Sequence, residues 1–155
     1  MKKYLQKKLN NEKGMTLIEL LAVIVIIAII AAIAIPAIGN LIENSRNGAV
    51  KSDYQNALNA ANIYFTENTS ALSVKVDVLA GTATGTTTSY LEDPGSLLDA
   101  VEITKAQGGN KIAGSADIDN DGTADYTVLA GTDGGLTNSE LGAIKNSDFT
   151  GTSID

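Results

Sequence analysis

Nine residues in the C-terminal third of the chain have the spacing of a cation-binding loop. In the run from Asp117 to Asp125, acids stand at positions 1, 3, 5 and 9 (Asp117, Asp119, Asp121 and Asp125), Gly122 at position 6 and Thr123 at position 7. Oxygen ligands at alternate positions around a glycine turn can wrap one calcium ion. Position 12, which closes an EF-hand with a bidentate carboxylate, is Val128. Two interpretations stay open: a calcium loop, and a hairpin whose Asp-Asn-Asp-Gly tip is a solvated turn.

A second candidate group is a carboxylate inside an apolar run. Every residue from Met15 to Ile35 is apolar except Thr16 and Glu19. A carboxylate in a membrane span costs about 2.5–3.5 kcal/mol on insertion scales, so it is expected only where it finds a partner. A cut between Gly14 and Met15 would give Met15 a charged α-amino group near the same depth, which could pair with Glu19 of a neighbouring copy. A Glu19 that snorkels to the lipid headgroups is the alternative.

The segment that carries Glu19 has the length of a membrane span. Leu20 to Ile35 is unbroken apolar sequence, and at ~1.5 Å per helical residue the run from Met15 covers about 30 Å. Residues 1–14 hold five lysines and one acid, which predicts a short leader with the N-terminus in the cytoplasm. We therefore expect a leader at 1–14 and a hydrophobic helix at 15–38.

Pro36 and Gly39 break helices, and they predict a kink or a short unwound stretch at this point. The apolar pattern then resumes at three- and four-residue steps from Ile42 to Tyr64, with polar residues between. We expect an amphipathic helix at 39–66 that continues the apolar one.

The remaining part, 67–155, is predicted to be a small head with an antiparallel sheet. Val74, Val76 and Val78 alternate as in a strand, and residues 111–117 and 124–130 read as two strands joined by the Asp119–Gly122 turn. Thr137 and Glu140 have capping-box spacing, which predicts a short helix near the C-terminus. The fold class is α+β: one long N-terminal helix packed on a small antiparallel sheet.

Composition argues against two classes of function. The chain has no cysteine and no histidine, and no nucleophile–base pair, phosphate loop or metal triad stands out, so we do not expect an enzyme. From Met15 onward, six basic and seventeen acidic residues give a formal charge of −11. Such a body repels phosphate backbones, so direct nucleic-acid binding by one subunit is not expected.

The N-terminal residues together resemble a known signal. Gly14 before the cut, an apolar Met15 after it, Glu19 fifth in the new chain, sixteen apolar residues and then Pro36 resemble the class III signal of type IV pilins and pseudopilins. The resemblance implies cleavage between Gly14 and Met15 by a prepilin peptidase, N-methylation of Met15, and subunit assembly through Glu19 and Pro36.

For the whole protein, the resemblance implies a single-pass protein of the cytoplasmic membrane that then assembles with copies of itself into an extracellular pilus. Its partners would be the prepilin peptidase, an assembly ATPase and a platform membrane protein, and its roles adhesion, motility or DNA uptake. Met15 stands where family members most often have Phe, and the absence of cysteine resembles pilins of Gram-positive bacteria. Some pseudopilins are similar in holding calcium in this region.

Three other interpretations of the same segment remain. A pseudopilin of a type II secretion or competence machine shares this N-terminus but builds a short rod. A membrane-anchored extracellular binding module would keep its leader and would not need Glu19. An ordinary secretory signal fits poorly, because the apolar run is too long and contains an acid.

Overall fold

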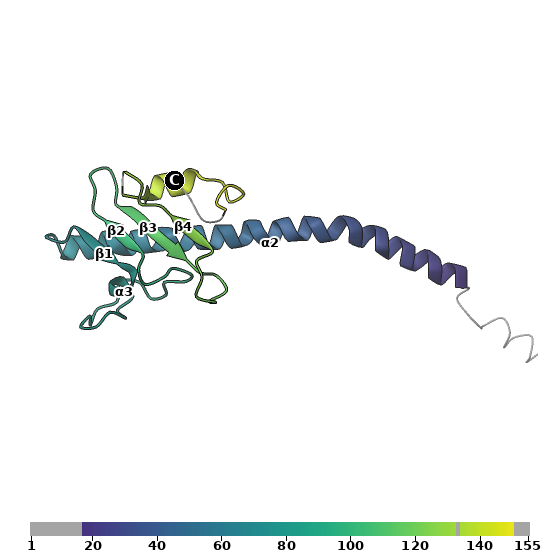
Figure 1. Ribbon diagram of the computed structural model, residues 1–155, viewed down its shortest axis with the longest axis horizontal. Coiled ribbons are helices and arrows are strands. Elements are labelled where there is room, and N and C mark those ends of the chain that lie inside the picture. Colours follow the sequence, from purple (N-terminus) through teal and green to yellow (C-terminus); the bar gives the residue numbers. More distant parts are fainter. Residues whose placement is uncertain (1–16, 133, 151–155) are drawn as a thin grey trace, which may run out of the picture. The chain divides into compact units, whose positions relative to one another are not determined.

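The computed structural model describes residues 17–132 and 134–150. Its longest element is helix α2, Leu17–Glu67, of 51 residues. The chain divides into two compact units, Met1–Ile42 and Glu43–Asp155, so α2 contributes to both (Figure 1). The expected long helix and small antiparallel sheet are confirmed, and the arrangement is α+β and pilin-like.

In the first unit, Leu17–Ile42 of α2 is helical throughout and its large apolar side chains are exposed. Among the described residues, α2 is the one helix long and apolar enough to cross a membrane by length and composition. Pro36 lies inside it, and the helix continues unbroken through Pro36 and Gly39. The unwound stretch that these residues predicted is therefore not present in this structure.

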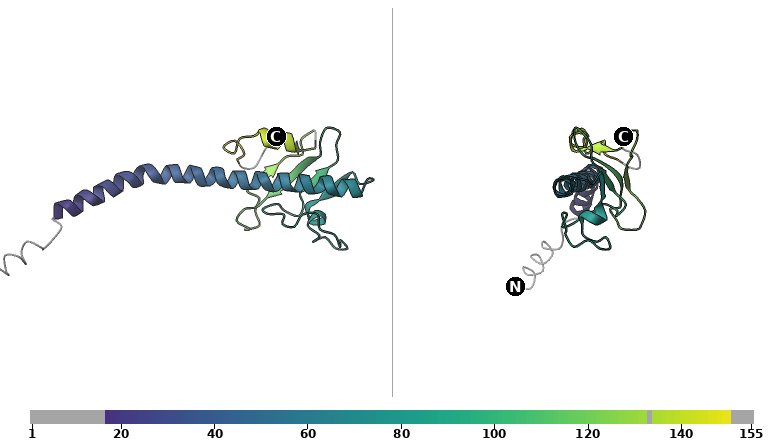
Figure 2. Two further views of the ribbon diagram at one scale, coloured as in Figure 1. Left: turned by 180° about the vertical axis from the view of Figure 1, so that it is seen from behind. Right: turned by 90° about the vertical axis from the view of Figure 1, so that its left-hand side faces the viewer.

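In the second unit, strands β1 (Ser73–Lys75), β2 (Glu102–Thr104), β3 (Lys111–Ala116) and β4 (Tyr126–Val128) follow one another in an antiparallel sheet. A fifth strand, β5 (Leu136–Thr137), pairs with the start of β3. The sheet lies alongside the C-terminal part of α2 (Figures 1 and 2). Strand β3 is central because its first residues pair with β2 and β5 and its last ones with β4.

The core of this unit lies between α2 and the sheet. Tyr54 and Leu58 on α2 pack with Ile103 of β2 and Ile112 of β3, and all four are at most 1% exposed. The Tyr54 hydroxyl also donates a hydrogen bond to the Gly114 carbonyl oxygen at 2.8 Å, and burial raises the pKa of this phenol. Of the apolar positions that predicted the second half of the helix, Val50, Ala57, Ala60 and Ala61 are buried in this core, whereas Ile42 and Ala49 are exposed.

The prediction of one strand through Val74, Val76 and Val78 is only partly right. Strand β1 ends at Lys75, and Val76–Leu79 form a single helical turn, α3. Val76 and Leu79 are both fully buried, and a three-residue step places them on one face of a helical turn, whereas a strand would send them to opposite faces. Packing of these two side chains therefore overrides the period-two pattern.

The other predicted elements near the C-terminus are confirmed. The two predicted strands are β3 and β4, although β4 is shorter than the range 124–130. Asn120 and Gly122 in the turn between them have positive φ, as expected for Asn and Gly. Helix α4, Asn138–Ala143, begins after Thr137, whose side chain and that of Glu140 form the predicted capping box.

Candidate functional site

The first candidate site is the helical segment around Glu19, in the first turn of α2. Large apolar side chains cover this segment on all sides, and they are about half exposed or more, for example Ile27 at 58% and Ile33 at 70%. An exposed apolar surface of this length is stable only against lipid or against other protein. The predicted cleavage and methylation site, Gly14 and Met15, lies outside the described residues.

The second candidate site is the turn between β3 and β4. Single oxygen atoms of Asp117, Asp119 and Asp125 lie within 4.8 Å of one another. Asp117 is 7% exposed, and its carboxylate accepts hydrogen bonds from the backbone N–H groups of Asn120 and Gly122 at 2.7 and 2.9 Å. The chain folds this way locally because the Asp117 carboxylate binds the turn's own N–H groups.

The electrostatics of this turn reflect the crowding of its acids. A backbone hydrogen bond from Asp121 lowers the pKa of Asp119, but desolvation and the negative charges of Asp121, Asp125 and Asp117 together raise it above its ordinary value. Asp121 is not among these three. Its carboxylate accepts hydrogen bonds from the hydroxyl and the backbone N–H of Thr123, which lower the pKa of Asp121. The sequence predicted five ligand residues at this site: Asp117, Asp119, Asp121, Thr123 and Asp125. The structure brings the carboxylates of Asp117, Asp119 and Asp125 together.

A third feature, which the sequence analysis missed, fixes the C-terminal segment to α2. Asn47 is 1% exposed: its amide donates to the Asn146 carbonyl oxygen at 2.8 Å and accepts a hydrogen bond from the Tyr126 hydroxyl. Lys51 Nζ donates to the Ile144 carbonyl oxygen at 2.8 Å. The only sequence signal was Asn47 itself, a polar residue in phase with the buried positions Val50, Tyr54 and Ala57.

Phe149 completes this attachment of the C-terminal segment. Its side chain is fully buried, with its ring stacked on Tyr126 at 5.7 Å between centroids and edge-on to Tyr54 at 6.2 Å. A chain without cysteine thus holds this region with an aromatic cluster and hydrogen bonds to α2.

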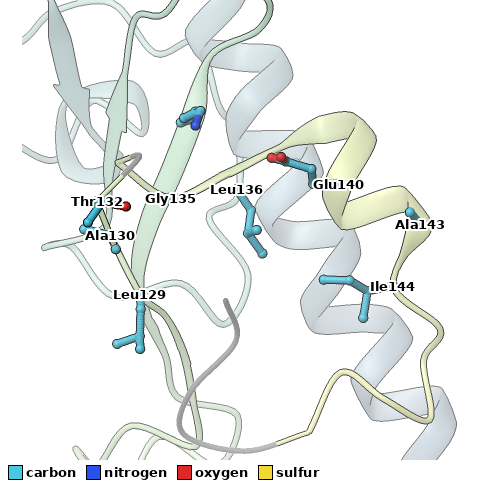
Figure 3. A pocket seen from close by; sticks show the side chains of 10 residues that line it. Leu129, Ala130, Thr132, Gly135, Leu136, Glu140, Ala143 and Ile144 are labelled. Carbon is cyan, nitrogen blue, oxygen red and sulfur yellow. The ribbon is translucent and has the colours of Figure 1, made fainter.

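Two cavities on the surface of the second unit are lined wholly by residues that the structure describes. The larger, of about 560 Å³, lies between the segment after β4 and helix α4, with Leu129, Leu136 and Ile144 among its lining side chains and Glu140 at one side (Figure 3). The smaller, of about 250 Å³, lies beside α2 and is lined by asparagines and hydroxyl groups. Neither cavity includes Glu19 or the acidic turn.

Comparison with known proteins agrees with the architecture. Residues 9–35 match the family described as the prokaryotic N-terminal methylation motif. This motif is the class III signal of type IV pilins and pseudopilins, and it covers Gly14, Met15 and Glu19. No curated protein and no solved structure gives a significant match to the chain.

The motif and the helix together indicate a general class of protein. They support a type IV pilin-like or pseudopilin-like protein in general, a family of structural proteins that are generally not enzymes. They fit insertion into a membrane followed by extracellular assembly, with processing by a prepilin peptidase into a subunit of a larger filament.

Proposed function

We propose that this protein is the structural subunit of a type IV pilus filament. The leader 1–14 is removed, Met15 is methylated, and Leu17–Ile42 moves from the cytoplasmic membrane into the core of a helical homopolymer, where Glu19 pairs with the Met15 amine of a neighbouring copy. The observation that carries this proposal is the exposed apolar helix that bears one acid within a methylation motif. The assembly ATPase, the platform protein and the roles in adhesion, motility or DNA uptake belong to the same proposal.

The outward face of α2 in the second unit supports packing between copies. This unit carries six basic and sixteen acidic residues, a formal charge of −10, so copies repel one another unless they meet at a neutral surface. One exposed stripe of α2 has no charge. At three- and four-residue steps it consists of Ser45, Ala49, Ser52, Asn56, Asn59, Ile63 and Thr66.

Contacts within the unit engage two of the charged side chains beside this stripe. Lys51 and Asp53 flank it, but Lys51 binds the Ile144 carbonyl and Asp53 accepts hydrogen bonds from the backbone and hydroxyl of Ser96, at 3.0 and 2.8 Å. The hydroxyls of Ser52 and Thr66 donate to the helix carbonyls of Gly48 and Asn62. The stripe thus presents mostly methyl, methylene and amide groups, a surface on which a second α2 can pack closely.

Two matched pairs of variants test the proposal in the native cells, with sheared filament protein measured against the membrane pool. We expect Glu19→Gln to abolish the sheared fraction and Glu43→Gln, an exposed acid on the same helix, to leave it unchanged. Asn56→Lys should reduce the sheared fraction at least tenfold, because it places a charge in the packed stripe, whereas Thr87→Lys on an exposed loop should not. Normal filaments from Glu19→Gln would refute the proposal.

The alternatives predict different results in the same cells. A pseudopilin gives the same dependence on Glu19 but no long filaments in sheared material. A membrane-anchored binding module keeps residues 1–14 and is indifferent to both Glu19→Gln and Asn56→Lys. Filament length and the starting residue therefore separate the three.

We further propose that Asp117, Asp119 and Asp125 bind one calcium ion. Support comes from the convergence of single oxygens of the three carboxylates within 4.8 Å of one another. At a calcium concentration of one hundred times the dissociation constant, the unit should gain about 2.7 kcal/mol. Asp119→Asn should remove the calcium-dependent rise in melting temperature, and Asp99→Asn should keep it. A wild-type melting temperature that is the same in calcium and in chelator would refute the site.

A further inference from the structure

The smaller cavity is built from neutral polar groups. It lies between α2, the loop from β2 to β3 and the first turn of α4, and holds about 250 Å³. Asn62, Asn110 and Asn138 contribute amides, Thr137 and Ser139 are the nearby hydroxyl residues, and buried Leu58 is the apolar member of the lining. None of its lining residues is charged, although the unit has a formal charge of −10.

Each of the three asparagines takes part in a hydrogen bond to another asparagine. Asn110 Nδ2 donates to Asn62 Oδ1 at 2.7 Å, and Asn138 Nδ2 approaches Asn59 Oδ1 at 3.4 Å. An amide has two donor hydrogens and an oxygen with two lone pairs, so the Asn62–Asn110 bond leaves both residues with further donor and acceptor capacity. The cavity therefore offers donors and acceptors together, from three separate elements.

Two glycines line one edge of this cavity. Gly108 and Gly109 have φ of +97° and +135°, a backbone region that other residues rarely adopt. A Cβ at Gly109 would lie 3.6 Å from Thr137 Cγ2, in ordinary van der Waals contact with another lining residue. The loop thus exposes backbone rather than side chain at this edge.

We propose that this cavity binds one ring of a neutral sugar. Sugar hydroxyls both donate and accept, as the amides do. An anionic ligand would meet no cationic group here and would be repelled by the acidic unit. The volume is below the roughly 300–1,000 Å³ of sites for drug-sized ligands, which limits the occupant to a small ring.

The test uses the full chain in zwitterionic detergent, because sugar-based detergents would compete for the site. The probes are glucose, galactose, mannose and N-acetylglucosamine, with glucuronate as the charged comparison, and binding is followed by saturation-transfer NMR and titration. We expect at least one neutral probe to bind with a dissociation constant of roughly 1–10 mM, and glucuronate to bind at least tenfold more weakly. This test does not require filament assembly, so its result is independent of the proposed function.

Matched asparagine variants locate the binding. Asn110→Ala should weaken the preferred sugar at least tenfold, and so should Asn62→Leu, which removes the amide. Asn44→Ala, an exposed asparagine of the same helix outside the cavity, should bind as the wild type does. Melting curves confirm that each variant is folded. If no neutral probe binds at 50 mM, or if Asn110→Ala and Asn62→Leu both bind like the wild type, the proposal is wrong.

Discussion

Phe149→Ala should strongly destabilise the second unit. The side chain is fully buried between Tyr54 and Tyr126, so its removal leaves a cavity in the place where the C-terminal segment meets α2 and β4. Phe-to-Ala substitutions in cores cost about 3–5 kcal/mol, and this range includes the stabilisation that the ring gains from stacking on its aromatic neighbours. A domain of this size has about 5–15 kcal/mol in total, so the variant should lose about a fifth or more of its stability.

Urea unfolding of the fragment Glu43–Asp155, followed by tyrosine fluorescence and far-ultraviolet circular dichroism, measures this loss. The fragment is suitable because every buried core side chain of the described residues lies between Val50 and Phe149. Leu72→Ala is the control, since Leu72 is 76% exposed and its truncation should change the free energy of unfolding by less than about 0.5 kcal/mol. A loss below about 1 kcal/mol for Phe149→Ala would mean that the C-terminal segment is not part of the core.

Three further predictions concern hydrogen bonds in the same unit. Tyr126→Phe should cost about 1–3 kcal/mol in urea, because it leaves the buried Asn47 oxygen without its donor. Thr137→Ala should cost about 0.5–2 kcal/mol through loss of the helix cap, whereas the exposed Ser139→Ala should be nearly neutral. Hydrogen bonds from the backbone N–H and then the hydroxyl of Thr137 lower the pKa of Glu140 below 4.5. Its contribution to stability is therefore present above that pH and lost as the pH falls further, and Glu140→Gln should flatten the acid side of a pH–stability profile.

The helix and the caps could be predicted because their signals are local. The apolar run, the amphipathic period and the Thr137–Glu140 spacing each act over a few residues, and each appears where expected. Val76 and Val78 show the limit of such signals. Their alternation is a strand signal, but burial of Val76 with Leu79 under the sheet decides the local structure, and this packing depends on residues distant in the chain.

The candidate sites also differ in whether a local sequence signal or the packing of distant residues reveals them. Glu19 stands out in the sequence because an acid in an apolar run is costly wherever the run ends up. The acidic turn was visible as a spacing, but the hydrogen bonds from Thr123 to the Asp121 carboxylate were not. The asparagine cavity could not be predicted, because Asn62, Asn110 and Asn138 come together only when three elements pack.

The central claim is that the chain is processed at Gly14 and assembled through Glu19. Intact mass and N-terminal sequencing of protein sheared from its native cells, beside a Glu19→Ala strain, test it most directly. We predict a chain that starts at Met15 with the added mass of one methyl group, and no sheared protein from the Glu19→Ala strain. A chain that still starts at Met1, or one cut after the apolar run, would contradict the claim.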